Sequence, residues 1–381
     1  MGCSESGTTF EKERLLPPVD GRGQGAPGKY VLVIHGGAGT MSKESSTPEQ
    51  RAKYKAALGD ALRAGYAVLK DGGEAMDAVV AAPHGTDCPL FNSGKGAVFN
   101  VEGKNELETS LMLSKPPSTH NVTPTRRGIG LTLLTHTRNP SHLARALYLH
   151  PSLAPHTFLS GSNAEHLGQS LGEEMVDPEY FWTEHRWREH RKGLGLPEEP
   201  LPYPPKKGEG SEAPLDQLPT GTVGAVALDI RGCIASLTST GGRTNKLVGR
   251  IGDTPHMGAG FWAEEWVESK GKKWWDRIMG KKKGRKVKGV GVSGTGDGDY
   301  FIRLATASTI AHRVKFLNES LGKATQTAVD DLFQDGSLGG VIAVDRDGDV
   351  AMPMNCSGMY RGVVREDGQP KTAIFQDDDL S

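Results

Sequence analysis

The sequence lacks a long apolar run. None of its stretches reaches the roughly 18 to 20 apolar residues that a membrane-spanning helix needs. The N-terminus also has no apolar core of the kind found in secretory signal peptides. These two absences predict a protein that neither spans a membrane nor is secreted, and we expect it to be cytoplasmic.

Cysteine is scarce: the 381 residues contain only Cys3, Cys88, Cys233 and Cys356. No two of them have C-x-x-C spacing, which argues against a disulfide framework and against a structural zinc site. We therefore expect reduced thiols.

Excess charge of either sign is missing as well. The 45 Lys and Arg residues are balanced by 46 Asp and Glu residues, so the net charge of −1 gives no basic footprint for nucleic acid. Glycine is abundant, with 51 residues, which predicts many tight turns. A chain of this length can bury a sizeable core in one large domain or two small ones.

The first ordered segment follows a tail, residues 1–28, that we expect to be disordered. "KYVLVIHGGAGT" (29–40) predicts a buried strand that runs into a tight loop. Residues 47–82 have helical apolar spacing with a break at 71–73, which predicts two helices, and Pro83 ends the second one early.

Later segments predict further strands and helices. Residues 88–112 suggest a pair of strands, residues 126–151 a strand followed by a helix, and residues 160–192 a charged helical stretch. "VGAVALDIRGCIASLTSTGG" and "GGVIAVDRDGDVAMPMNCSG" share the layout of a hairpin with an Asp-x-x-Gly turn.

A threonine stands where an apparent linker ends. Residues from about 193 to 221 are rich in Pro, Gly and charge, and Gly221-Thr222 begins a run of short apolar segments. An interior threonine hydroxyl is a poor nucleophile, whereas a cut before Thr222 would free an α-amine with a pKa of about 7.7 to 8.0 that can act as its base. The alternative is a β-branched residue that simply opens a strand.

A series of motifs decides between these alternatives. "HGGAG", "PLFNSGKGAVF", "GTVGAVALD", "TSTGG", "NKLVGRIGDTP", "SGTGDGD" and "GGVIAVD" occur in this order. Together they resemble the plant-type asparaginase and isoaspartyl peptidase family of N-terminal nucleophile (Ntn) hydrolases. The resemblance implies one α+β domain (29–381), an α/β/β/α sandwich cut into an α chain (29–221) and a β chain (222–381). It also implies hydrolysis of L-asparagine or β-aspartyl peptides.

Within this resemblance, Thr222 matches the nucleophile and Thr240 the threonine that assists it. Arg250 would hold the substrate α-carboxylate and Asp253 the α-ammonium. An Arg fork suits a carboxylate, although a surface salt bridge is the ordinary role of such a residue.

The same resemblance assigns the remaining site residues. Thr295 and Gly296 would donate to the oxyanion, Gly298 would contact substrate, and Asn92 would steady charge. His35 of "HGGAG" is interpreted as a buried histidine with satisfied hydrogen bonds.

Three segments depart from the family pattern. Pro83 and Gly85 interrupt a helix, and Glu108 and Thr109 of "ELETSLM" stand where the family more often has Asp and Ala, which we expect to alter packing near the site. A basic insertion covers residues 270–288.

No redox or organic cofactor is implied, while some family members bind a structural alkali cation whose ligands the sequence does not identify. The resemblance implies a homodimer of αβ units. "MGCSES" fits acylation of Gly2 and Cys3, which with the insertion would bind a membrane surface; the alternative is an unmodified tail. Two further alternatives for function are a glycosylasparaginase-like amidase and a catalytically silent membrane-associated scaffold.

Overall fold

The computed structural model describes residues 29–44, 46–82, 88–204, 221–268 and 286–380. The acylation motif and nearly all of the basic insertion lie outside these ranges.

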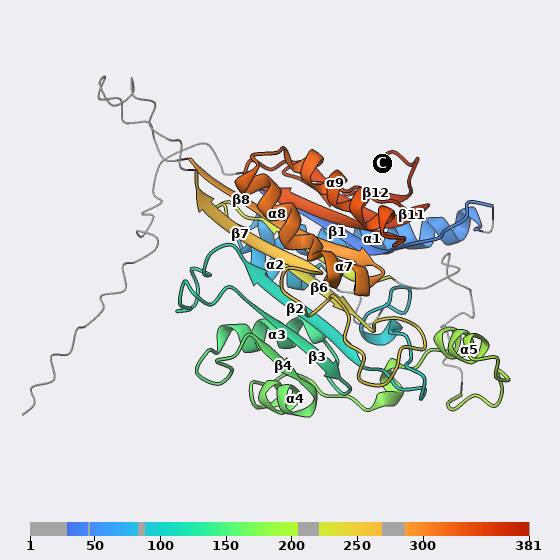
Figure 1. Ribbon diagram of the computed structural model, residues 1–381. Coiled ribbons are helices and arrows are strands. Elements are labelled where there is room, and N and C mark those ends of the chain that lie inside the picture. Colours follow the sequence, from blue (N-terminus) through green and yellow to red (C-terminus); the bar gives the residue numbers. More distant parts are fainter. Residues whose placement is uncertain (1–28, 45, 83–87, 205–220, 269–285, 381) are drawn as a thin grey trace, which may run out of the picture.

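Two sheets form the centre of the molecule (Figure 1). The large sheet has the strand order β12-β11-β1-β5-β6-β2-β3-β4, and the small sheet has the order β10-β9-β8-β7. All neighbours pair antiparallel except β3 and β4. The strands of the large sheet are β1 (Val31–Gly39), β2 (Leu107–Leu113), β3 (Gly128–Leu134), β4 (Phe158–Ser160), β5 (Val223–Leu228), β6 (Ile234–Thr240), β11 (Gly358–Val364) and β12 (Lys371–Phe375). Those of the small sheet are β7 (Phe261–Val267), β8 (Val287–Gly296), β9 (Gly339–Asp345) and β10 (Val350–Ala351).

Helices cover the outer face of each sheet. The helices are α1 (Pro48–Lys70), α2 (Ala75–Ala81), α3 (Pro140–Leu149), α4 (Gly161–Ser170), α5 (Glu184–Gly193), α7 (Gly298–Leu304), α8 (Thr306–Phe316) and α9 (Leu321–Gln334). Helices α1 to α4 contact the large sheet, whereas α8 and α9 contact the small one (Figure 1). The prediction of a mixed α+β fold is confirmed.

The inner faces of the two sheets pack on each other through apolar side chains. β5 contacts β8 and β9, and β1 contacts β9. Val33 and Val226 of the large sheet share one buried cluster with Ile342 and Val344 of the small sheet. The ends of β5 and β6 therefore lie close to the end of β8.

The helix break was correctly located. Thr47 caps α1 through a reciprocal capping box with Gln50, and α1 ends at Lys70 before α2 begins at Ala75. Helix α2 ends at Ala81, ahead of Pro83.

The prediction of two strands in residues 88–112 is wrong for the first one. Only β2 forms there, with a short 3₁₀ turn, η2 (Gly94–Gly96), before it. Side-chain amides replace strand pairing: Asn105 Nδ2 donates to the carbonyls of Ala97 and Val98, and Asn92 Oδ1 accepts from the Val98 amide. Residues 160–192 likewise form two helices, α4 and α5, with a 3₁₀ turn, η3 (Pro178–Phe181), between them.

Candidate active site

Thr222 immediately precedes β5 and is buried, with 5% of its surface exposed. Its backbone N–H donates to Thr295 Oγ1 at 3.1 Å, and the Ala38 amide donates to the same oxygen at 3.2 Å. Thr295 thus contacts the nitrogen that would become a free amine if the chain were cut before Thr222.

His35 contacts the other side of the Thr222 peptide group. Its Nδ1 lies 2.8 Å from the Thr222 carbonyl oxygen and its Nε2 lies 2.8 Å from Ser293 Oγ. Burial lowers the pKa of His35 to about 3, so the ring is neutral. Since a carbonyl only accepts, Nδ1 carries the proton and Nε2 accepts from Ser293. This agrees with a satisfied buried histidine, but the sequence did not indicate that its partner is Thr222.

Gly37 brings the "HGGAG" strand against the Gly221-Thr222 junction. Its φ of +120° is in a region that side chains disfavour, and a Cβ there would lie 2.7 Å from Gly221 Cα. Only glycine allows this approach.

Asn92 and Thr240 form a second polar cluster at the end of β6. Thr240 Oγ1 accepts from the Gly242 amide at 2.9 Å, and Asn92 Nδ2 lies 3.4 Å from the same oxygen. Asn92 Nδ2 also donates to the Gly242 carbonyl at 2.6 Å. Asn92 therefore fixes the turn that follows Thr240.

These strand ends surround a small pocket, which we call the reaction pocket. It is lined by Glu108, Thr222, Thr240, Gly242, Arg243, Arg250, Gly252, Asp253, Gly296, Asp297 and Gly298. Of the predicted site residues, Thr295, Asn92 and Gly221 lie behind its wall and the other six line it. Its free volume of about 20 Å³ holds little more than one water molecule.

Asp253 lies at the buried inner end of the reaction pocket. Its Oδ2 has no hydrogen-bond partner within the described ranges, and a Cβ on Gly298 would lie 2.4 Å from its Oδ1. Burial, together with the negative charge of Glu108, raises the pKa of Asp253 to about 7. A cationic ligand would relieve this unmatched carboxylate.

Glu108 is a second carboxylate at the inner end. Its Oε1 accepts from the Gly252 amide at 2.9 Å, while its buried Oε2 is without a partner among the residues described. Burial raises the pKa of Glu108 and lowers that of Lys246, whose Nζ is 3.9 Å away, so desolvation dominates over their attraction. Thr109, by contrast, donates to the Thr238 carbonyl and does not line the pocket.

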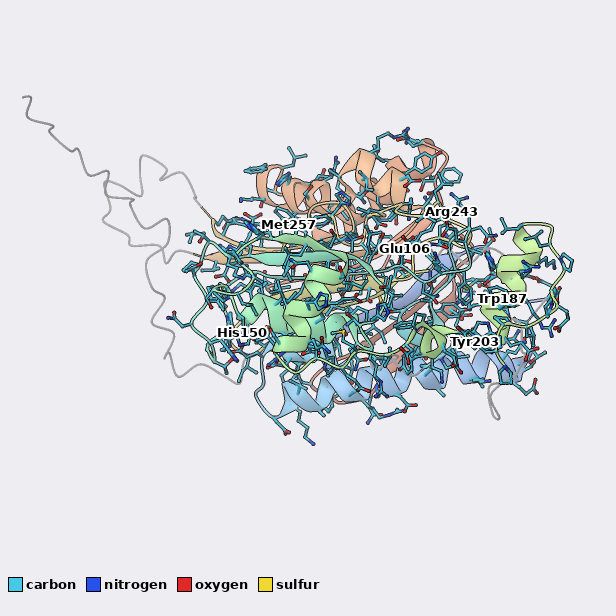
Figure 2. The ribbon with its side chains drawn as sticks, turned by 90° about the horizontal axis from the view of Figure 1, so that it is seen from below. Glu106, His150, Trp187, Tyr203, Arg243 and Met257 are labelled. Carbon is cyan, nitrogen blue, oxygen red and sulfur yellow. The ribbon has the colours of Figure 1, made fainter. Side chains whose placement is uncertain are left out.

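Two arginines complete the reaction pocket. Arg250, with 21% of its side chain exposed, pairs with Asp299 at 2.8 Å. Arg243, 59% exposed, lies 4.0 Å from Asp297 at the start of α7. Figure 2 shows Arg243 next to the C-terminal helices. We call Arg250, Asp253 and Glu108 the inner end of the pocket, and Arg243 and Asp297 its outer end.

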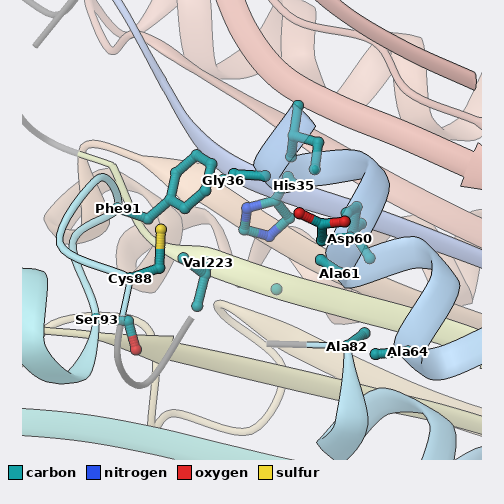
Figure 3. Close-up of a pocket in the computed structure, with 14 residues that line it drawn as sticks. His35, Gly36, Asp60, Ala61, Ala64, Ala82, Cys88, Phe91, Ser93 and Val223 are labelled. Carbon is teal, nitrogen blue, oxygen red and sulfur yellow. The ribbon is translucent and has the colours of Figure 1, made fainter. Parts of the chain in front are cut away.

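A larger cavity of about 310 Å³ lies between α1, β1 and β5 (Figure 3). Most of its lining is apolar, including Leu58, Ala61 and Phe91. It contains none of Thr222, Arg250 and Asp253. The smaller pocket holds all three and is therefore the candidate active site.

The described residues contain no group of three or more His, Cys, Asp or Glu that could hold a metal ion, and no helix long and apolar enough to cross a membrane. Cys88, Cys233 and Cys356 form no disulfide with one another; Cys3 lies outside the described ranges.

Comparison with known proteins agrees with these motifs. A family model described as "Asparaginase" matches residues 28–268 and 286–374. The isoaspartyl peptidase of Escherichia coli K12 is 36% identical over 357 residues, covering 92% of this chain and 97% of that protein. A probable isoaspartyl peptidase/L-asparaginase 2 of Arabidopsis thaliana is 32% identical, covering 92% and 100%. The isoaspartyl peptidase/L-asparaginase of Mus musculus is 33% identical, covering 84% and 83%.

Proposed function

The chain belongs to the asparaginase family, and on this premise we propose that it is a hydrolase of the side-chain amide of L-asparagine and of β-aspartyl peptides. One observation carries the proposal. A single pocket contains a threonine at the end of a linker, an arginine, and a buried carboxylate with an unpartnered oxygen. The last two match the carboxylate and ammonium of an amino-acid substrate.

Activation would begin with cleavage of the Gly221-Thr222 bond by the chain itself. Thr222 Oγ attacks the Gly221 carbonyl, the Thr222 nitrogen leaves, and water hydrolyses the resulting ester. The products are an α chain ending at Gly221 and a β chain of residues 222–381. The small free volume of the reaction pocket, about 20 Å³, supports this order.

Substrate hydrolysis would use the amine that cleavage releases. This amine accepts the proton from Thr222 Oγ as the oxygen attacks the side-chain carbonyl, and returns it to the departing ammonia or peptide amine. Water then hydrolyses the aspartyl ester. Arg250 and Asp253 hold the amino-acid end, Gly298 leaves room beside Asp253, and Thr295 and Gly296 stabilise the oxyanion. Thr240 assists Thr222, and Asn92 holds Thr240.

The finer structural expectations belong to the same proposal. The packing of helices outside two facing sheets supports the Ntn α/β/β/α sandwich. We also propose a homodimer of αβ units, and a membrane-surface contact through acylated Gly2 and Cys3.

Intact mass spectrometry of purified protein tests the proposal. Wild type should split into two chains, and N-terminal sequencing of the smaller chain should begin "TVGAVALD"; Thr222→Ala should remain in one piece and be inactive. A cut elsewhere would remove Thr222 from its role. An uncut wild type without activity on asparagine would favour the scaffold, and activity confined to glycosylated asparagine would favour the glycosylasparaginase-like alternative.

A further inference from the structure

The outer end of the reaction pocket carries a cation, Arg243, whose backbone is held in a fixed place. Arg243 follows the turn after Thr240. On one side, Asn92 donates to the carbonyl of Gly242 in that turn; on the other, the Lys246 amide donates to the Arg243 carbonyl. Its backbone is therefore anchored on both sides. Its guanidinium makes only the long 4.0 Å ion pair with Asp297 among the described residues, so most of its N–H groups are free for a ligand.

The two ends of the pocket differ in access to solvent. Arg243 is 59% exposed, whereas Asp253 is only 5% exposed. If the inner end binds the aspartyl moiety, as the proposed function requires, the leaving group must extend toward the exposed end.

Substrates differ at this exposed end. Asparagine releases ammonia, which has no carboxylate. A β-aspartyl dipeptide releases an amino acid whose carboxylate is two bonds beyond the scissile nitrogen.

We propose that Arg243 binds the C-terminal carboxylate of the leaving residue and so gives the enzyme a preference for β-aspartyl dipeptides over their C-terminal amides. This inference rests on the proposed function. The negative charge of Asp297 repels the same carboxylate and therefore reduces the preference for the dipeptide over its amide. Both charges are partly exposed, and the effect is that of a surface ion pair.

Three substrates separate this role from others: β-aspartylalanine, β-aspartylalanine amide and L-asparagine. Arg243→Met should lower kcat/KM for β-aspartylalanine by about three- to fivefold more than for the other two substrates, as expected for exposed charges. Asp297→Asn should raise kcat/KM for β-aspartylalanine by about twofold. Its side chain makes no capping hydrogen bond to α7, so this substitution preserves the helix start.

Arg303→Met is the matched control. Arg303 lies on α7, is 57% exposed and pairs with Asp335, but does not line the pocket. It should change none of the three rates. Equal losses for all three substrates in Arg243→Met, or no loss for β-aspartylalanine, would overturn the assignment to the leaving group. If wild type hydrolyses none of the substrates, the proposed function fails and the inference fails with it.

Discussion

The inner and outer ends of the reaction pocket contain the same kinds of side chain in different surroundings. Asp253 and Glu108 are buried, each with an oxygen that has no partner in the described parts of the chain, and burial raises the pKa of both. Arg243 and Asp297 are partly exposed and remain hydrated. A ligand at the inner end therefore satisfies groups that water does not reach, whereas a ligand at the outer end replaces water. Large energetic effects should be confined to the inner end.

The largest predicted effect is a loss of kcat/KM when Arg250 is substituted. Arg250→Lys keeps the charge but loses the fork that binds a carboxylate through two bonds, so kcat/KM on asparagine should fall by about 10- to 100-fold. Cleavage at Gly221 should still proceed, as judged by intact mass. Unchanged kinetics would exclude Arg250 from substrate binding and weaken the comparison.

The next effect is a pH dependence to which Asp253 contributes, beside the Thr222 α-amine that serves as the base. Its pKa of about 7 in the empty pocket means that the carboxylate needed for an ammonium is lost as pH falls below 7. A bound ammonium would lower this pKa, so the acid limb of kcat should lie at lower pH than that of kcat/KM. Coincident limbs in the two profiles would argue against contact between Asp253 and the substrate.

The same group gives a stability prediction of known sign. The folded pKa of Asp253 is raised above its unfolded value, so its contribution to stability is present at low pH and is lost as pH rises through about 7. The Tm of a Thr222→Ala protein should fall between about pH 4 and pH 7, and adding Asp253→Asn should reduce that fall. An equal fall in the two proteins would assign the pH dependence to other groups.

Substitution of Glu108 should have a smaller effect, a shift of the acid limb of the kcat/KM profile. Glu108→Gln removes a negative charge that raises the pKa of Asp253, so the acid limb of kcat/KM should move to lower pH. Glu108→Asp retains the charge and should leave the limb near its wild-type position. A shift of equal size in both variants would indicate repacking instead.

The smallest predicted effect is a difference between the two ends of the pocket in their dependence on ionic strength. Raising the ionic strength from about 0.05 to 0.5 M screens exposed charges, so the advantage of β-aspartylalanine over its amide should fall by about twofold. The KM for asparagine should change less, because Asp253 and Glu108 at the inner end are buried. Equal sensitivity would mean that the two ends are equally solvated.

Motifs predicted the parts of the candidate site that lie within single segments. Thr222, Arg250, Asp253 and Gly298 are each recognisable from neighbouring letters. Arg243 was not, because its importance depends on the meeting of the β6 turn with the start of α7. The contact of His35 with Thr222 likewise depends on the pairing of β1 with β5.

The fold likewise has features that single segments predict and features that depend on contacts between segments. Apolar periodicity and a Gly-Gly break located α1 and α2. The missing strand in residues 88–112 was not predictable from apolar content, since the amides of Asn92 and Asn105 take the backbone groups that a strand would pair. Local patterns report local structure, whereas side-chain bonds across a loop depend on the final arrangement.

The strand order would have a consequence for assembly if the chain is cut at Gly221-Thr222, as proposed. From one edge, the large sheet takes two strands from residues 222–381, then β1, then β5 and β6, then β2, β3 and β4. Segments from before and after the proposed cleavage site therefore alternate in one sheet. Before the cut, the linker keeps these segments at a high effective concentration; afterwards, only their real concentration counts. The mature enzyme would hold together without the linker, but refolding after full denaturation would become a second-order reaction between two polypeptides.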